Sequence, residues 1–125
     1  TFEEFVNFIS LLSKNRKVII TNGFIHNPII DKLKIKLNYK PIDNLTLKDK
    51  INIFELQYLI KNCSCLISCH GTPSHIASNY NIKIIDIIDN TEIKFFESYN
   101  HHFNNKIQII RENFVNLSKK IITSI

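Results

Sequence analysis

The residues of this chain that are best suited to chemistry lie together, in the segment Cys69-His70-Gly71-Thr72-Pro73-Ser74-His75. Gly71 lets a backbone approach a ligand closely, and Thr72 is predicted to cap a short helix that has Pro73 at its first position. A helix that begins in this way directs unpaired N–H groups and the positive end of its dipole at a ligand. The segment therefore predicts an anion-binding turn.

The flanking residues extend this turn into a strand–turn–helix–strand unit, which is half of a nucleotide-binding α/β motif. His75 lies one turn into the helix, where it could reach a diphosphate, although packing against a neighbouring loop is an alternative. His70 follows the strand. It either contacts the ligand or occupies this position without a role in binding. An earlier strand ends at Asn22-Gly23, which either opens on the same rim or forms an ordinary turn. The predicted binding residues are Asn22, Gly23, His70, Gly71, Thr72, Pro73, Ser74 and His75.

Three cysteines near the two histidines raise the question of a zinc site. Cys63, Cys65 and Cys69 have strand spacing, which separates alternate side chains by roughly 6.5 Å, whereas thiolates bind zinc at ~2.3 Å and must nearly touch. We therefore expect small packing residues and no bound metal. Asp86 and Asp89 bracket a strand end, where they could take part in metal-bound diphosphate chemistry, but they are interpreted as turn-capping carboxylates.

Helices and strands alternate in the predicted order of elements. Thr1 and Glu4 have the spacing of a capping box, and Asn113 precedes the last helical pattern. Strands that are apolar on both faces and separated by helices favour a parallel sheet covered on both sides. The predicted fold is α/β, a Rossmann-like three-layer domain with a mainly parallel sheet of about five strands and helices on both faces. Helices are expected near 2–12, 27–38, 52–60, 73–80, 91–99 and 114–121, strands near 17–21, 42–45, 64–69, 83–88 and 106–110, and a polar surface loop over 99–103.

Composition and charge limit the class of protein. The chain has 125 residues, 44% hydrophobic and 22% charged, which suits one domain over residues 1–125. The net charge of +5 comes from scattered lysines, so a solvated face is expected, weak attraction to an anionic membrane leaflet is the alternative, and nucleic acid is not expected as a partner. No apolar run approaches ~18 residues, and no signal peptide opens the chain. A start at Thr1 suggests a fragment of a longer protein.

One stretch resembles a known family. Residues Leu66-Ile67-Ser68-Cys69-His70-Gly71-Thr72-Pro73-Ser74-His75-Ile76-Ala77, followed by Lys83-Ile84-Ile85-Asp86-Ile87, are similar to the donor-binding half of GT-B glycosyltransferases, above all heptosyltransferase-like enzymes. The family pattern is an apolar strand, a small residue, Asp-Thr-Gly, then His and a small-residue helix. Ser74, His75 and Ala77 fit it. His70 stands where the family has Asp, and Gly71-Thr72 reverses the Thr-Gly order.

This resemblance implies a glycosyltransferase that transfers a sugar from a nucleotide-diphosphate donor to a surface glycan or lipid-linked acceptor, as in bacterial lipopolysaccharide or capsule biosynthesis. The chain would be the carboxyl-terminal half of a two-domain enzyme, with the catalytic base in the amino-terminal half and therefore not identified here. Neither cofactor nor metal is implied. The implied location is cytoplasmic, with peripheral attachment to the inner face of the cell membrane as a variant. A sugar-nucleotide epimerase-like GT-B enzyme and a non-catalytic nucleotide-binding or assembly module are the alternatives.

Overall fold

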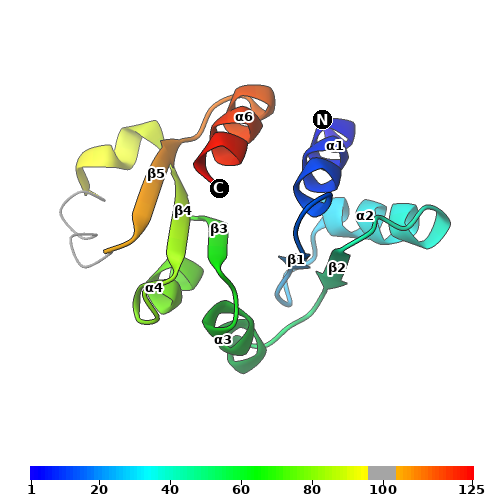
Figure 1. Cartoon of the computed structure of the whole chain (residues 1–125), viewed down its shortest axis with the longest axis horizontal. Coiled ribbons are helices and arrows are strands. Elements are labelled where there is room, and N and C mark those ends of the chain that lie inside the picture. Colours follow the sequence, from blue (N-terminus) through cyan, green and yellow to red (C-terminus); the bar gives the residue numbers. More distant parts are fainter. Residues whose placement is uncertain (96–103) are drawn as a thin grey trace. The chain divides into compact units, whose positions relative to one another are not determined.

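The computed structural model describes residues 1–95 and 104–125. Figure 1 shows the helices and strands in chain order. They form two compact units, residues 1–53 and 54–125, each of which is described by itself. Each unit has its own parallel sheet and its own apolar cluster. The sequence predicts a single domain over residues 1–125, and it stays a prediction that the two units belong to one domain.

The first unit begins with the predicted capping box. The side chain of Thr1 accepts a hydrogen bond from the backbone N–H of Glu4, whose own side chain binds back to the first residue. The side chain of Asn27 caps the next helix by accepting from the N–H of Ile29, with a proline in the first turn. Local sequence thus determines where both helices begin. The elements are α1 (Phe2–Ser13), β1 (Val18–Thr21), α2 (Pro28–Tyr39) and β2 (Leu45–Lys48).

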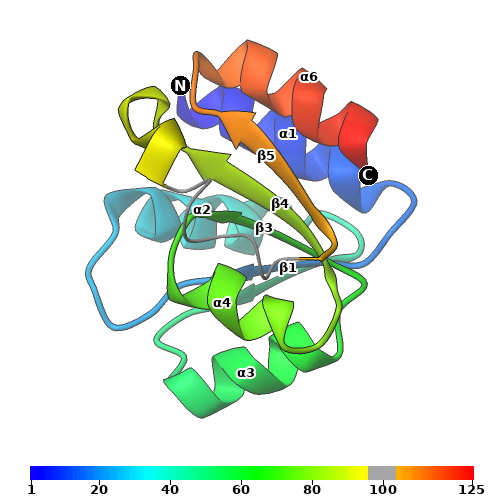
Figure 2. The same cartoon turned by 90° about the vertical axis from the view of Figure 1, so that its left-hand side faces the viewer.

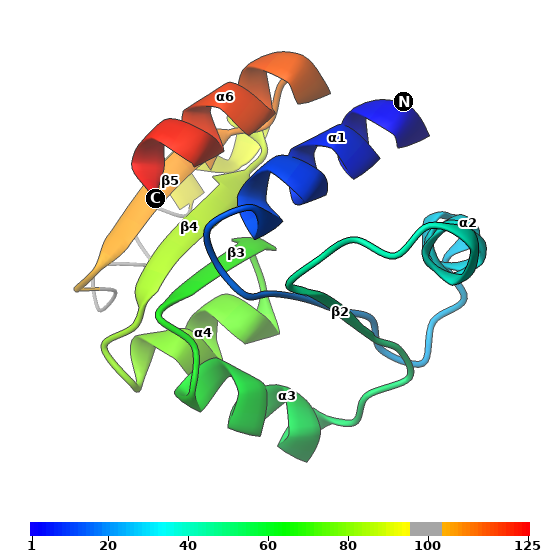
Figure 3. The ribbon, with the colours of Figure 1, turned by 45° about the vertical axis from the view of Figure 1, so that its right-hand side comes forward.

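Figure 3 shows α1 and α2 above the strand β2. The core of this unit is formed by apolar side chains from these two helices and the two strands. The strands β1 and β2 are parallel, and their register runs from Val18 opposite Leu45 to Thr21 opposite Lys48. Alternation therefore places one set of apolar side chains on the same face of the sheet. On that face, Ile20, Leu45 and Leu47 pack against the buried residues Val6, Ile9 and Leu33 of the two helices.

The second unit also has capped elements. The side chain of Asn113 accepts from the N–H of Asn116 and so begins the last helix where the sequence predicted. Residues 83–88 and 106–110 form strands with the predicted bounds. The elements are α3 (Ile53–Lys61, which starts at the last residue of the first unit), β3 (Cys65–Cys69), α4 (Thr72–Ser78), β4 (Lys83–Ile88), the 3-10 turn η1 (Asn90–Glu92), β5 (Lys106–Ile110) and α6 (Phe114–Ser124).

The three strands of this unit are parallel and lie in the order β3-β4-β5, so β4 is central. Figure 2 shows α6 on one face of this sheet and α3 and α4 on the other. Leu66 and Ile84 are opposite each other in the register and pack with Ile60 and Ala77 of the two helices. This apolar face ends toward the carboxyl ends of the strands, where polar residues replace it.

The structure corrects two predictions about the strands. The five strands form two sheets, of two and three strands, and no ladder joins the sheets among the described residues. Apolar composition indicates that a strand is buried but does not specify its backbone partner. The second strand begins at Leu45 and not near residue 42, because Asn44 has a left-handed backbone (φ 61°) that interrupts the extended chain. The expected loop over 99–103 and the end of the expected 91–99 helix lie outside the described residues.

Candidate functional site

A buried polar network lies on the α4 face of the three-stranded sheet. Asp86 is in the central strand, opposite Ser68 in the register, and has no exposed surface. Its two oxygens have different partners: Ser74 Oγ donates to Oδ1 at 2.8 Å, and His70 Nδ1 lies 2.7 Å from Oδ2. Ser68 Oγ lies 2.9 Å from Ser74 Oγ. The network therefore joins β3, the β3–α4 turn, α4 and β4.

Strand alternation explains why these residues meet. Side chains two residues apart share a face, so Ser68 and Asp86 continue the face that begins with Leu66 and Ile84. Helix α4 packs on this face through Ala77, which brings the buried Ser74 of its first turn over the carboxylate. The polar network is thus the last layer of the same face that forms the apolar core.

His70 is held at both its backbone and its ring. Its N–H donates to the carbonyl of Ile87 at 3.1 Å, which extends the β3–β4 ladder by one residue. Its side chain is 12% exposed, and the His75 ring meets it edge-on with 5.3 Å between centroids. An ionised Asp86 only accepts, so the His70 ring carries a proton on Nδ1 and its Nε2 points away from the carboxylate. Asp86 therefore determines the orientation and the tautomer of His70.

Burial makes this pairing energetically important. A carboxylate removed from water is stable only when hydrogen bonds or an opposite charge replace its hydration. Ser74 and His70 supply those interactions to Asp86. The predicted role of Asp86 as a turn-capping residue at the strand end is wrong, because it lies within β4 and binds side chains. Asp89 has that role, since its Oδ1 accepts from the N–H and the hydroxyl of Thr91.

The turn after β3 differs from the prediction in its capping. Gly71 is the N-cap residue and Thr72 is already helical, so the prediction that Thr72 caps the helix is wrong. Gly71 has φ 157° and ψ −161°, a region that is essentially restricted to glycine. Its carbonyl accepts from the N–H groups of Ser74 and His75, and Pro73 has no N–H. The turn can therefore offer a ligand at most the amides of Gly71 and Thr72.

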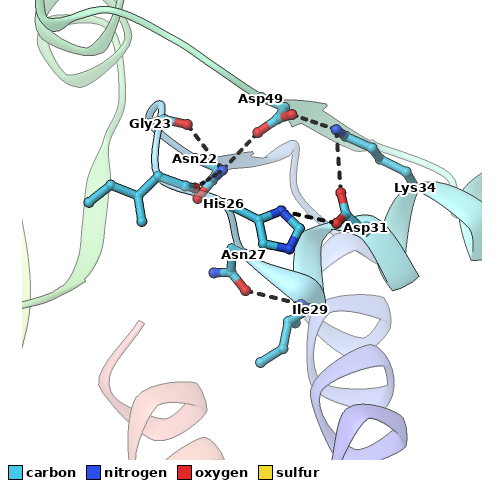
Figure 4. Close-up of polar contacts among 9 residues, drawn as sticks. Asn22, Gly23, His26, Asn27, Ile29, Asp31, Lys34 and Asp49 are labelled. Atoms are coloured by element: carbon cyan, nitrogen blue, oxygen red, sulfur yellow. Dashed lines mark hydrogen bonds and ion pairs between the residues drawn. The ribbon is translucent and has the colours of Figure 1, made fainter.

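A second polar cluster lies in the first unit and contains the other two predicted site residues. Figure 4 shows Asn22 Nδ2 donating to Asp49 Oδ1 at 2.8 Å and to the carbonyls of Gly23 and Ile25. Asn22 follows β1 and Asp49 follows β2, so the cluster lies at the carboxyl ends of these parallel strands. An open pocket of about 300 Å³ is lined by these residues and by Phe24, His26, Asn27, Ile30, Asp31, Lys34 and Lys50.

The charges of this second cluster are paired within it. Lys34 binds Asp49 and lies 3.9 Å from Asp31, which also lies 3.4 Å from His26. Hydrogen bonds from Lys34 and Asn22 lower the pKa of Asp49 to about 2. The hydrogen bond between Lys34 and Asp49 raises the pKa of Lys34. The Asn22 side chain therefore holds its loop in place, and Lys34 and Asp49 neutralise each other within the cluster.

The predicted site residues thus fall into two groups. His70, Gly71, Thr72, Pro73, Ser74 and His75 are together beside Asp86, whereas Asn22 and Gly23 belong to the cluster in the other unit. Sequence reasoning missed the roles of Asp86 and Asp49. The signal for Asp86 was present, because it is the only charged residue within the apolar run Ile84–Ile88. The contact between Asp49 and Lys34 had no comparable signal, since the chain has many scattered lysines.

Comparisons with protein families, curated proteins and solved structures gave no match to this chain. Within residues 1–95 and 104–125, no three His, Cys, Asp or Glu side chains are grouped so that they could hold a metal ion. Cys63, Cys65 and Cys69, all of them described residues, form no disulfide, and burial raises the pKa of Cys63. None of the described helices is long and apolar enough to cross a membrane.

Proposed function

We propose that this chain is the donor-binding part of a glycosyltransferase and binds the diphosphate of a nucleotide sugar at the β3–α4 turn. The observation that carries the proposal is the fully buried Asp86, which fixes the His70 ring beside that turn. Positions beyond the carboxyl ends of parallel strands are where α/β sheets bind ligands. A buried carboxylate that orients a histidine with one of its oxygens is typical of a working site, because it gives the ring a fixed hydrogen-bonding direction.

In this proposal, the chain's own residues bind and orient the leaving diphosphate. The His70 ring, when doubly protonated, donates from Nε2 to a phosphate oxygen, and the edge-on His75 provides a second imidazole nearby. The amides of Gly71 and Thr72 complete the donor set. No base for the acceptor hydroxyl is assigned to these residues. The proposed acceptor is a glycan or glycolipid, and the proposed base lies in an amino-terminal partner domain. The proposed location is the cytoplasm or the inner membrane face.

The test is a calorimetric titration of the 125-residue chain with ADP, UDP, GDP and CDP and their sugar conjugates, without added divalent metal. We expect at least one nucleotide to bind, and His75→Ala to weaken that binding by about 1 to 3 kcal/mol, the range for a hydrogen bond to a charged group. Lys48→Ala, an exposed change in the other unit, is the control. Binding by none of the nucleotides, or equal affinities for the parent chain and His75→Ala, would refute the proposal.

A further inference from the structure

The side chain of Arg111 crosses the carboxyl edge of the three-stranded sheet. Arg111 follows β5 directly, and its N–H donates to the carbonyl of Ile88 at 2.8 Å, so its backbone is fixed beside the end of β4. Its guanidinium Nη2 donates to Cys69 Sγ at 3.0 Å, at the end of β3. Since β4 lies between β5 and β3, the side chain passes over the end of the central strand.

This position places Arg111 next to the proposed diphosphate site, on the side opposite His70. Cys69 and His70 are consecutive residues, and His70 still makes a ladder hydrogen bond, so their side chains point to opposite faces. His70 approaches the turn from the Asp86 face, and Arg111 approaches through Cys69 from the other face. Gly71, which has no side chain, lies just beyond both. The turn therefore has one cationic side chain on each flank when His70 is doubly protonated.

The Asp86–His70 pair alone does not supply the net positive charge that a bound diphosphate requires. A doubly protonated His70 is balanced by the ionised Asp86 at 2.7 Å, so this pair adds no net positive charge for a diphosphate. An arginine keeps its charge at all ordinary pH values. The Arg111 side chain contacts a thiol, which is a weak acceptor. No ion pair among the described residues includes Arg111.

Asp89, which follows β4, does not neutralise Arg111 by direct pairing. Hydrogen bonds from Thr91 lower the pKa of Asp89, and the positive charge of Arg111 adds to that lowering. The positive charge of Arg111 therefore acts on the carboxylate that follows β4, and the one side-chain hydrogen bond of Arg111 that the described residues show goes to the Cys69 thiol. A planar guanidinium matches two oxygens of one phosphate, or one oxygen of each of two phosphates.

We propose that Arg111 is a second ligand of the diphosphate and holds it from the flank opposite His70. This inference rests on the proposed function for its nucleotide ligand, but the anion site itself can be tested separately. Arg111 is a binding residue in this reading, and it supplies the net positive charge that the Asp86–His70 pair lacks. It also predicts that Cys69 lies beneath the bound anion, because Arg111 touches its sulfur.

The experiment compares the chain with Arg111→Gln, Arg111→Lys and Arg16→Gln, after circular dichroism has established folding. Arg16, the only other arginine, is exposed and provides the matched control. Each protein is titrated with inorganic pyrophosphate and with ADP, UDP, GDP and CDP. We expect Arg111→Gln to weaken binding at least about tenfold. Arg111→Lys should restore only part of the affinity, since an ammonium cannot bind two oxygens in a fixed fork. Arg16→Gln should bind as the parent chain does.

Alkylation of Cys69 by iodoacetamide, followed by mass spectrometry, locates the anion. Pyrophosphate or a nucleotide should slow alkylation of the exposed Cys69 in the parent chain but not in Arg111→Gln, with the half-buried Cys63 and Cys65 as internal references. Nucleotide binding that is unaffected by Arg111→Gln and leaves Cys69 unprotected would overturn this inference and leave the proposed function standing. Pyrophosphate binding through Arg111 without any nucleotide binding would support the anion site and overturn the proposed function. Binding of neither probe would overturn both.

Discussion

Removing the His70 ring should destabilise the chain because it leaves Asp86 charged, buried and short of a partner. Loss of one partner of a buried ion pair costs about 3 to 5 kcal/mol. His70 is 12% exposed, so water can reach part of its place, and Ser74 remains bound to the carboxylate. We therefore expect His70→Ala to lower the free energy of unfolding by about 2 to 3 kcal/mol.

The double variant His70→Ala/Asp86→Ala tests the cause of this loss. If the cost comes from the stranded carboxylate, removing Asp86 as well should relieve it, and the double variant should lose at least about 1 kcal/mol less than the sum of the single variants. His75→Ala removes an edge-on ring contact and should cost about 0.5 to 1.5 kcal/mol.

Urea unfolding at pH 7, followed by far-ultraviolet circular dichroism, measures these differences, provided that the dependence on urea concentration is equal for all variants. Losses that add within about 0.5 kcal/mol would refute the argument, because independent sites behave in that way. A loss for His70→Ala no larger than that for His75→Ala would refute it as well.

Two further predictions follow from backbone and charge. Gly71→Ala should lower the free energy of unfolding by about 1 to 3 kcal/mol, because φ 157° with ψ −161° strains any residue that has a Cβ, whereas Gly23→Ala should be nearly neutral in a thermal melt. The pKa of Asp49 is lowered from 3.8 to about 2, so its stabilisation is complete above pH 3.8 and is lost as the pH falls toward 2. Acid titration followed by circular dichroism should show a shallower loss between those pH values for Asp49→Asn than for the parent chain; equal slopes would contradict this.

The starts of α1, α2 and α6, and the positions of every strand but β2, were predictable because they depend on neighbouring residues. Thr1 with Glu4, Asn27 and Asn113 each satisfy an N–H within three residues, so their helices begin where a local pattern places them. The second strand was misplaced because the left-handed backbone of Asn44 is stabilised from outside the segment, by a side-chain hydrogen bond to the carbonyl of Ser13. The division into two sheets depends on backbone pairing between distant residues, which hydrophobic patterning does not encode.

The candidate site was predictable only along the chain. The segment from His70 to His75 was identified because its residues are adjacent in sequence, and Ser74 and His75 do lie beside His70. The partner that orients His70 is 16 residues away, and Asp86 was interpreted as a turn residue. Its position opposite Ser68 follows from the register of β3 and β4, which cannot be read from either strand alone.

The burial of Asp86 also bears on how the chain selects that register. Apart from Asp86, the run Ile84–Ile88 consists only of isoleucine, so its apolar side chains hardly distinguish the native alignment with β3 from one shifted by a residue. A one-residue shift would turn Asp86 to the opposite face of the sheet. There it would lose both Ser74 and His70 and would be buried without a partner, at a cost of several kcal/mol. A single carboxylate in the middle strand thus penalises misaligned pairing and gives an otherwise repetitive strand a unique place during folding.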